Sequence, residues 1–509
     1  MALARVHWQV LTVAAITLGG LALRLVDVVD NPSGFFADEA AVGYLADLVL
    51  HNGKDQYGEF LPLFFRNFGD DKLPLVVYLD IPFVAILGRT ELAVRAMVAI
   101  AGSLTIVTTY LLAKELFRRE LPSILAAACL AIMPWHIHYG RTGFGETVLF
   151  LLLLTLGLYL LLRAFRLESS LLPAAFTFAI SLYSYRAGWV VLPPLFLVIG
   201  ALYWRELLRD RRNLMWSLGV IALFALPIVR HVLSDSSDRS EQAWIFKVES
   251  EKSTLQLFWE YYRSYFSISF LFTDADKGPI LRHYLPGQGM LYWFQAPLLL
   301  MGLAACVMKP DRRLGILLAL LVLCPLGGAL SESSPQSLRA LAQTLPLALL
   351  SALGLTFAID LMAQAAPKWR LQVAYAALAV VAVVATLSLA AYLQHYYSDY
   401  PRLSAGFWGW QDGPQRVMSH FLTVQDDYDE LFMDGSFNAP EVFIPFYTGK
   451  DCLKCHIGDS QAFVPTKRQL FALRPEALQR DRYDYVQKGE FTLAGGTPGF
   501  VFVEIARRR

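Results

Sequence analysis

The chain has 509 residues, of which 56% are hydrophobic and only 17% are charged. Soluble domains carry about 25% charged residues, so the composition argues against a soluble globular protein. The 44 basic and 43 acidic residues nearly cancel, which gives no indication of a nucleic-acid or acidic partner. Five cysteines are too few for a disulfide-stabilised secreted scaffold. The composition therefore predicts an all-α polytopic membrane protein.

Eleven apolar stretches approach the roughly 20 residues that a helix needs to cross about 30 Å of hydrocarbon. They are residues 8–27, 92–113, 121–135, 147–162, 171–185, 189–203, 214–232, 290–308, 314–330, 340–361 and 371–393. A twelfth stretch, 73–87, is shorter and contains Pro74, Asp80 and Pro82. Stretches of this length are often interfacial or re-entrant. We therefore predict eleven crossings and no crossing by residues 73–87.

Basic residues in the short loops indicate the orientation. If the N-terminus is cytoplasmic, the cytoplasmic turns carry Lys114, Arg118, Arg119, Arg163, Arg166, Arg205, Arg209, Arg211, Arg212, Lys309, Arg312, Arg313, Lys368 and Arg370. The short outer turns then hold little beyond Arg141, Arg186 and Arg339. Such an excess of Lys and Arg marks the cytoplasmic side. The sequence thus predicts a cell-membrane (inner or plasma membrane) protein with a cytoplasmic N-terminus and an extracytoplasmic C-terminus.

Two units follow from this topology. Residues 1–393 form a transmembrane module with long outer loops at 28–91 and 233–289. Residues 394–509 are less hydrophobic and are predicted to form a small α/β domain outside the membrane. Within this domain, 442–447 and 499–505 are expected to be short strands because they are rich in aromatic and β-branched residues.

The first outer loop holds the residues most typical of chemistry. Asp38 and Glu39 follow two phenylalanines and open an apparent helix, where Asp38 could simply cap the N-terminus. Farther on, Asp70, Asp71 and Lys72 stand at the entry to the stretch 73–87. An ordinary solvated turn at a membrane surface would explain these three residues equally well.

A series of motifs in this order resembles a known family. They are Arg24 late in the first helix, Asp38-Glu39, Lys72-Leu73-Pro74, 88–95 (GRTELAVR), 133–141 (MPWHIHYGR) followed by Glu146, and 339–346 (RALAQTLP). The order resembles membrane glycosyltransferases of the GT-C fold. Within that fold it resembles the protein O-mannosyltransferase and aminoarabinose transferase branch, the dolichyl-phosphate-mannose-protein mannosyltransferase family. The resemblance covers most of 1–393 and is clearest over the first 165 residues.

The resemblance implies a mechanism. Such enzymes move a hexose or pentose from a polyprenyl phosphate to an acceptor, with inversion at the anomeric carbon. It implies that Asp38 is the base and that Glu39 orients it or makes it more basic. It also implies that Lys72 binds the lipid phosphate, which needs cations as it departs. From their place on the outer rim, Arg141, Arg186 and Arg339 are candidates to join Lys72.

Other residues on the outer side are candidate substrate contacts. They are Asp71, Glu146, Tyr183, Tyr185, His136 and His138. Asp71 could instead pair with Lys72, tyrosines at this depth are often belt residues, and the histidines could be structural. No metal site is predicted, because too few further ligands can be placed near the histidines. Many relatives have two prolines after the lysine, so Lys72-Leu73-Pro74 is a departure from the family pattern.

The motif Cys452-x-x-Cys455-His456 matches the pattern for covalent c-type haem attachment. Two cysteines at this spacing outside the membrane could also form a local disulfide or contribute to a metal site. We favour a disulfide or ordinary thiols and expect no required cofactor, while leaving a divalent metal open.

Two other functions remain open alternatives. One is a lipid-linked glycan flippase or transporter. The other is a polymer ligase that uses a polyprenyl diphosphate, in which the loop 233–289 would matter more than Asp38. The acceptor, whether protein, lipid or envelope glycan, is not indicated by any motif.

Overall fold

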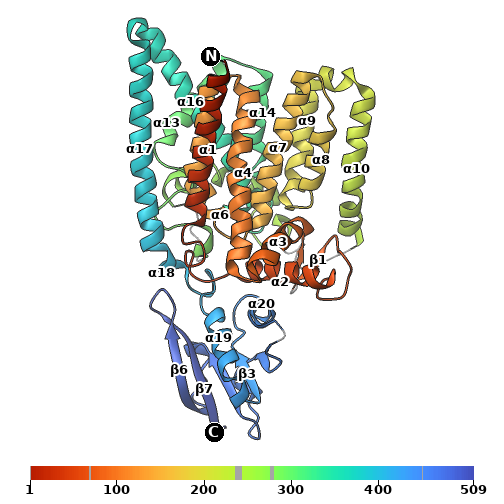
Figure 1. Ribbon diagram of the computed structural model, residues 1–509, viewed down its shortest axis with the longest axis vertical. Coiled ribbons are helices and arrows are strands. Elements are labelled where there is room, and N and C mark those ends of the chain that lie inside the picture. Colours follow the sequence, from red (N-terminus) through yellow and green to blue (C-terminus); the bar gives the residue numbers. More distant parts are fainter. Residues whose placement is uncertain (1, 68–69, 235–243, 275–279, 450, 509) are drawn as a thin grey trace.

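The computed structural model describes residues 2–67, 70–234, 244–274, 280–449 and 451–508. Long helices run side by side in a bundle, and a smaller α/β unit lies beyond one end of it (Figure 1). The N-terminus lies at the opposite end of the bundle. The bundle helices are α1 (Ala2–Leu25), α4 (Glu91–Phe117), α5 (Glu120–Ile132), α6 (Pro134–Tyr139), α7 (Gly145–Leu167), α8 (Leu172–Ser181), α9 (Ala187–Arg209), α10 (Arg211–Ser234), α12 (Thr254–Ser264), α13 (Gln295–Met308), α14 (Arg312–Leu323), α15 (Leu326–Ala329), α16 (Thr344–Ala365) and α17 (Arg370–Ser398).

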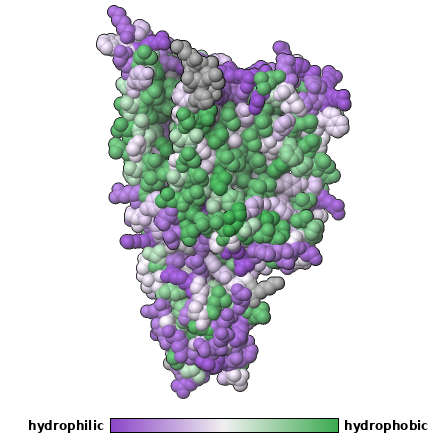
Figure 2. Space-filling view, viewed as in Figure 1, coloured by the Kyte–Doolittle hydropathy of each residue, from purple (hydrophilic) through white to green (hydrophobic). Residues whose placement is uncertain are grey.

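Eight helices within the described residues are long and apolar enough to cross a membrane. Three further predicted stretches fall on the shorter apolar helices α5, α8 and α13. Hydrophobic residues form a broad band across the bundle, and hydrophilic residues cover its two ends and the α/β unit (Figure 2). These features confirm the predicted polytopic helical membrane protein.

The stretch 73–87 forms the 14-residue helix α3 (Pro74–Leu87). At 1.5 Å per residue such a helix, like α13, is about 21 Å long. It lies with α2 (Ala37–Asn52) at the end of the bundle nearest the α/β unit (Figure 1). The residues before it form an antiparallel hairpin of β1 (Phe65–Asn67) and β2 (Asp70–Lys72). The predicted solvated turn is therefore a strand, which carries Lys72 inward.

The C-terminal unit contains α18 (Tyr400–Ser404), α19 (Pro414–Val424), α20 (Phe443–Thr448) and a five-stranded sheet. The strand order is β4 (Cys455–Ile457), β3 (Glu430–Met433), β5 (Gln469–Leu473), β7 (Pro498–Arg508) and β6 (Tyr483–Thr492). β3 pairs in parallel with β4 and β5, whereas β7 is antiparallel to β5 and β6. Residues 499–505 lie in β7 as predicted.

The strand predicted at 442–447 is wrong, because these residues form the end of a 3-10 turn and the helix α20. Phe443 and Phe446 are both buried. Their spacing of three places both rings on one face of a helix, whereas in a strand they would point to opposite faces. Burial of the two rings together therefore favours the helix over the local strand preference.

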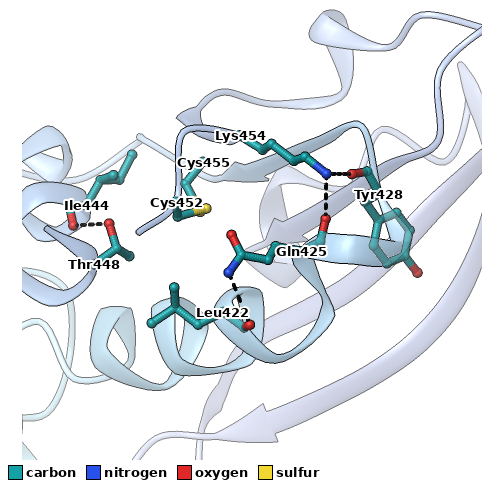
Figure 3. Close-up of a disulfide and its surroundings, with 8 residues drawn as sticks. All are labelled: Leu422, Gln425, Tyr428, Ile444, Thr448, Cys452, Lys454 and Cys455. Atoms are coloured by element: carbon teal, nitrogen blue, oxygen red, sulfur yellow. Dashed lines mark hydrogen bonds between the residues drawn. A yellow bond between two sulfur atoms is a disulfide. The ribbon is translucent and has the colours of Figure 1, made fainter. Parts of the chain in front are cut away.

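Cys452 and Cys455 are joined in a disulfide that closes the loop between α20 and β4 (Figure 3). Between them, Lys454 donates from Nζ to the carbonyl oxygens of Gln425 and Tyr428, each at 2.9 Å. The loop is thus tied both to itself and to the end of α19. Of the interpretations open for this motif, the disulfide is the one observed.

We expect replacement of both cysteines by serine to destabilise the C-terminal unit by about 2 kcal/mol, the loop-closure value for a four-residue loop. Thermal unfolding of the protein with and without reductant measures this. Reductant should lower the wild-type midpoint and leave that of Cys452→Ser/Cys455→Ser unchanged. An equal response of both proteins to reductant would contradict the prediction.

Candidate active site

Asp38 and Glu39 lie in the first turn of α2, and their side chains point in different directions. The backbone N–H of Phe36 donates to Glu39 Oε2 at 2.9 Å, so Glu39 caps the helix and Asp38 does not, contrary to the simplest sequence interpretation. Consecutive side chains on a helix project about 100° apart. Glu39 consequently points into the protein, while the Asp38 side chain is 44% exposed.

Glu39 is fully buried in an ion pair with Arg95 of α4. Arg95 donates from Nε to Oε1 at 3.0 Å and from Nη2 to Oε2 at 3.1 Å. The backbone N–H of Gly143 also donates to Glu39 Oε1. With both oxygens engaged and no exposed surface, Glu39 can orient α2 but cannot reach a substrate.

Lys72 lies between two carboxylates from separate helices. Its Nζ is 3.2 Å from Asp38 Oδ1 and 3.5 Å from Glu146 Oε1, at the start of α7. The Lys72 side chain is only 8% exposed. A largely buried ammonium group needs such counter-charges, because desolvation alone would favour its neutral form. Segments 34 and 74 residues away from Lys72 in sequence thus meet at one cation.

Two of the predicted arginines belong to the same region. Arg186 donates from Nη2 to the carbonyl oxygen of Asp71 at 2.9 Å, directly beside Lys72. Arg339 lines a narrow pocket together with Tyr185 and Thr147. Thr147 directly follows Glu146 in α7, so Arg339 lies near the start of the helix that carries the second carboxylate at Lys72.

The Asp71 carboxylate points away from the centre of this cluster. Its Oδ2 lies 3.4 Å from His231 Nε2, and His231 stacks on Phe64 with ring centroids 3.9 Å apart. Asp71 therefore helps to attach the hairpin to the end of α10. Lys72, by contrast, contacts the carboxylates of Asp38 and Glu146.

Other predicted site residues lie outside the cluster and join parts of the bundle. Arg141 is fully buried and donates to the carbonyl oxygens of Leu23, Asp27 and Asn31 and to the hydroxyl of Tyr397. Its guanidinium donors are thus engaged within the protein, and its phosphate role stays a prediction. Tyr183 donates to the carbonyl oxygen of Phe224, at 2.7 Å.

The two histidines of 133–141 are also internal. His136 Nδ1 lies 2.6 Å from Arg24 Nη2, and His138 lies 3.0 Å from the Tyr396 hydroxyl through Nδ1 and 2.8 Å from the Arg282 carbonyl oxygen through Nε2. Among the residues that the structure describes, no group of three or more His, Cys, Asp and Glu side chains could hold a metal ion. The histidines therefore have the structural surroundings that the sequence left open.

Arg282 is a site residue that sequence reasoning missed. Its guanidinium carbon lies 3.8 Å from the centroid of the Phe36 ring, two residues before Asp38. Burial lowers the pKa of Arg282, and the negative charge of Asp38 is the largest opposing influence. Its buried Nε has no hydrogen-bond partner among the described residues. A single arginine within the long loop 233–289 carries no local motif, so no sequence signal distinguished it.

Neutralising Glu39 and neutralising Asp38 should change the stability of the protein by different amounts. Glu39→Gln should lower the free energy of unfolding by about 3–5 kcal/mol, because Arg95 would remain as a buried charge without its counter-ion. Asp38→Asn should change it by less than about 1 kcal/mol, since that pair is partly exposed. Unfolding of the detergent-solubilised variants measures both. Equal stability of the two variants would contradict this assignment.

Because three histidines are buried, we expect the folded protein to lose stability at acidic pH. Burial lowers the pKa of His136, His138 and His283, to about 4 for His138. The unfolded chain therefore takes up protons near pH 6.5 that the folded protein does not. Stability should fall as the pH drops below about 6.5 and keep falling toward pH 4. Melting temperatures across this range should decrease less steeply for His138→Gln, and identical slopes would contradict the prediction.

Residues 71–231 match the family model described as dolichyl-phosphate-mannose-protein mannosyltransferase. This segment includes Lys72, Glu146, Tyr185 and Arg186 of the site. No curated protein matches the sequence.

Two solved structures share the architecture. The archaeal oligosaccharyltransferase AglB from Archaeoglobus fulgidus, in complex with an inhibitory peptide and a dolichol-phosphate, matches with a TM-score of 0.57 and 14% identity, over 97% of this chain and 74% of that chain. ArnT from Cupriavidus metallidurans, bound to undecaprenyl phosphate, matches with a TM-score of 0.56 and 13% identity, over 98% of each chain.

The chain therefore has the GT-C fold of membrane glycosyltransferases. Residues 71–231 are, in addition, similar to the mannosyltransferase family that the sequence motifs resemble.

Proposed function

We propose that the protein transfers a sugar from a polyprenyl-phosphate donor to an acceptor on the outer face of the membrane, with inversion at the anomeric carbon. The observation that carries the proposal is the contact between Asp38 and Lys72. It joins an accessible carboxylate to a nearly buried cation, 3.2 Å apart, at the end of the bundle next to the C-terminal unit. A base and a phosphate-binding cation are the two groups that this displacement needs.

The proposed step uses this pair directly. An acceptor hydroxyl or similar group attacks the anomeric carbon, and its proton passes to the Asp38 carboxylate. The bond from the anomeric carbon to the phosphate oxygen breaks, and its electron pair leaves with the polyprenyl phosphate. Lys72 offsets the negative charge on the departing phosphate, and Arg186, which donates to the backbone beside Lys72, adds positive charge together with Arg339. Glu39 maintains the direction of Asp38 through α2.

The polyprenyl-phosphate donor is supported by two neighbours of the same fold, one bound to undecaprenyl phosphate and the other in a complex with a dolichol-phosphate. The outer-face location rests on the loop charges. The basic residues assigned to the cytoplasm cluster at the end of the bundle that holds the N-terminus, for example Arg119, which pairs with Asp360 at 2.6 Å, and Arg166, which pairs with Glu115 at 2.6 Å.

Arg282 favours a second candidate donor, a polyprenyl diphosphate. It supplies an incompletely satisfied cation beside Asp38 from the loop 233–289, which is the loop that a diphosphate-dependent ligase would use. A second phosphate would add negative charge that Lys72 alone does not balance. The two donors can be separated by comparing Arg282→Gln with wild type.

The test is sugar transfer by purified protein from a panel of radiolabelled polyprenyl monophosphate and diphosphate sugars, with membrane extract as acceptor. Asp38→Asn should abolish transfer, a loss of about 10²-fold or more if the base is removed. Lys72→Met should impair it similarly. Asp71→Asn is the matched control, because its carboxylate faces His231 and it should retain most activity.

The outcomes separate the alternatives. Loss with monophosphate donors and little effect of Arg282→Gln would support the proposal. Transfer only from diphosphates, lost in Arg282→Gln, would establish the second candidate. If transfer persists in Asp38→Asn, the base assignment fails. If no donor reacts while reconstituted protein moves lipid-linked sugars across vesicles, the protein is a transporter.

A further inference from the structure

The C-terminal unit contacts the helix that carries Asp38, at its first residue. We infer that Gln411 is a positioning residue that fixes the first turn of α2 and thereby the direction of the Asp38 carboxylate. The inference rests on the proposed role of Asp38 as the base. It assigns to the C-terminal unit a part in building the site.

The side-chain amide of Gln411 bridges two segments far apart in sequence. Its Oε1 accepts from the backbone N–H of Ala37 at 2.8 Å, and its Nε2 donates to the carbonyl oxygen of Asn438 at 2.8 Å. Gln411 is 1% exposed and Ala37 is 2% exposed. Only one orientation of the amide satisfies both partners, because oxygen must face the N–H and nitrogen must face the carbonyl.

The Ala37 N–H is a group that needs an external partner. The first N–H groups of a helix have no acceptor within the helix, and leaving one buried and unpaired is costly. Glu39 satisfies the N–H of Phe36, and Gln411 satisfies the next one. Asp38 follows directly, so the two hydrogen bonds fix the backbone immediately before the proposed base.

The backbone around Gln411 is shaped to make this contact. Gln411 has a φ of 55°, in the left-handed region that non-glycine residues rarely adopt. Opposite it, Gly34 has a φ of 89°, and a Cβ there would lie 2.6 Å from the Asp412 nitrogen and the Trp410 carbonyl oxygen. The segment containing Gln411 and the loop before α2 thus approach too closely for a side chain. A non-glycine residue held in the left-handed region is the kind of local strain that functional positions retain.

Farther along α2, α20 makes an independent set of contacts. The ring of Phe446 packs against Gly43, where a Cβ would come within 2.7 Å of it. Arg89 pairs with Asp47 of α2 at 2.7 Å and also donates to the Phe446 carbonyl oxygen at 2.5 Å. These contacts hold the middle of α2 without Gln411. Loss of the Gln411 bond should therefore loosen the first turn and leave the rest of the helix in place.

Three variants test the inference. Gln411→Leu keeps an apolar side chain of similar length and removes both hydrogen bonds. Gln411→Glu keeps an acceptor for the Ala37 N–H. Gln469→Leu is the matched control in the same unit. Gln469 is also buried, and its amide donates to Glu430 Oε2 at 2.7 Å and to the Ala462 carbonyl oxygen at 3.1 Å, both within the C-terminal unit.

Hydrogen exchange of the full-length protein is the readout that does not depend on activity. Amides at the start of α2 should exchange about tenfold faster in Gln411→Leu, the change expected for one lost buried hydrogen bond. They should be protected in Gln411→Glu and in Gln469→Leu. Unchanged exchange at the start of α2 in Gln411→Leu overturns the inference, whether or not transfer is detected.

Kinetic measurements test whether the first turn of α2 affects the proposed base, Asp38. In Gln411→Leu, kcat should fall about tenfold while KM for the donor changes less than about threefold, because the base moves and Lys72 remains. Gln411→Glu should recover kcat and move the acidic limb of the pH–rate profile to higher pH, since it adds a negative charge near Asp38. An equal loss of kcat in Gln469→Leu would show a general effect of the unit and overturn the positioning role.

The two proposals fail in distinguishable ways. If wild-type protein transfers no sugar but exchange at the start of α2 rises in Gln411→Leu alone, the proposed transfer fails and the structural link stands. If wild type transfers sugar and Gln411→Leu matches it in kcat, the positioning role fails and the proposed function stands.

Discussion

The buried ion pair between Glu39 and Arg95 is the constraint on which the end of the bundle nearest the C-terminal unit depends. Burying two charges costs several kcal/mol for each ion unless every donor and acceptor is satisfied. The remaining donors of Arg95 reach the carbonyl oxygens of Val28, Val29, Pro32 and Gly34. The pair therefore fixes α2, α4 and the loop between α1 and α2 together. Without it, neither the place of Asp38 nor that of the segment around Gln411 would be defined.

Asp38 and Glu39 are neighbours in sequence but have different roles, because consecutive side chains on a helix point in different directions. Glu39 is fully buried among donors and is fixed in an ion pair, whereas Asp38 is 44% exposed and shares Lys72 with Glu146. The environment therefore separates a structural acid from an accessible one. Lys72, placed between these two acids, is held in a defined direction.

The helices and their order could be predicted from the sequence, because the length of an apolar stretch is a local property. Asp38 and Lys72 could be selected because the order of motifs resembles a family. The direction in which each of these side chains points could not be predicted. Nothing local shows that Arg141 ends among backbone carbonyls, or that Glu39 and not Asp38 caps α2. Arg282 and Gln411 were missed for a related reason, since each owes its place to contacts with segments more than 200 residues away in sequence.

The position of the site relative to the apolar band explains why it draws on so many segments. A polyprenyl chain requires the lipid phase, whereas a phosphate, a sugar and a polar acceptor require water. The junction of the bundle and the C-terminal unit is where the apolar surface ends and the hydrophilic surface begins (Figure 2). No single helix can supply groups to both environments at that depth. Hence α2, the β1–β2 hairpin, the start of α7 and the loop carrying Arg282 converge there. The C-terminal unit covers this junction, which gives its contact with α2 a direct bearing on the proposed chemistry.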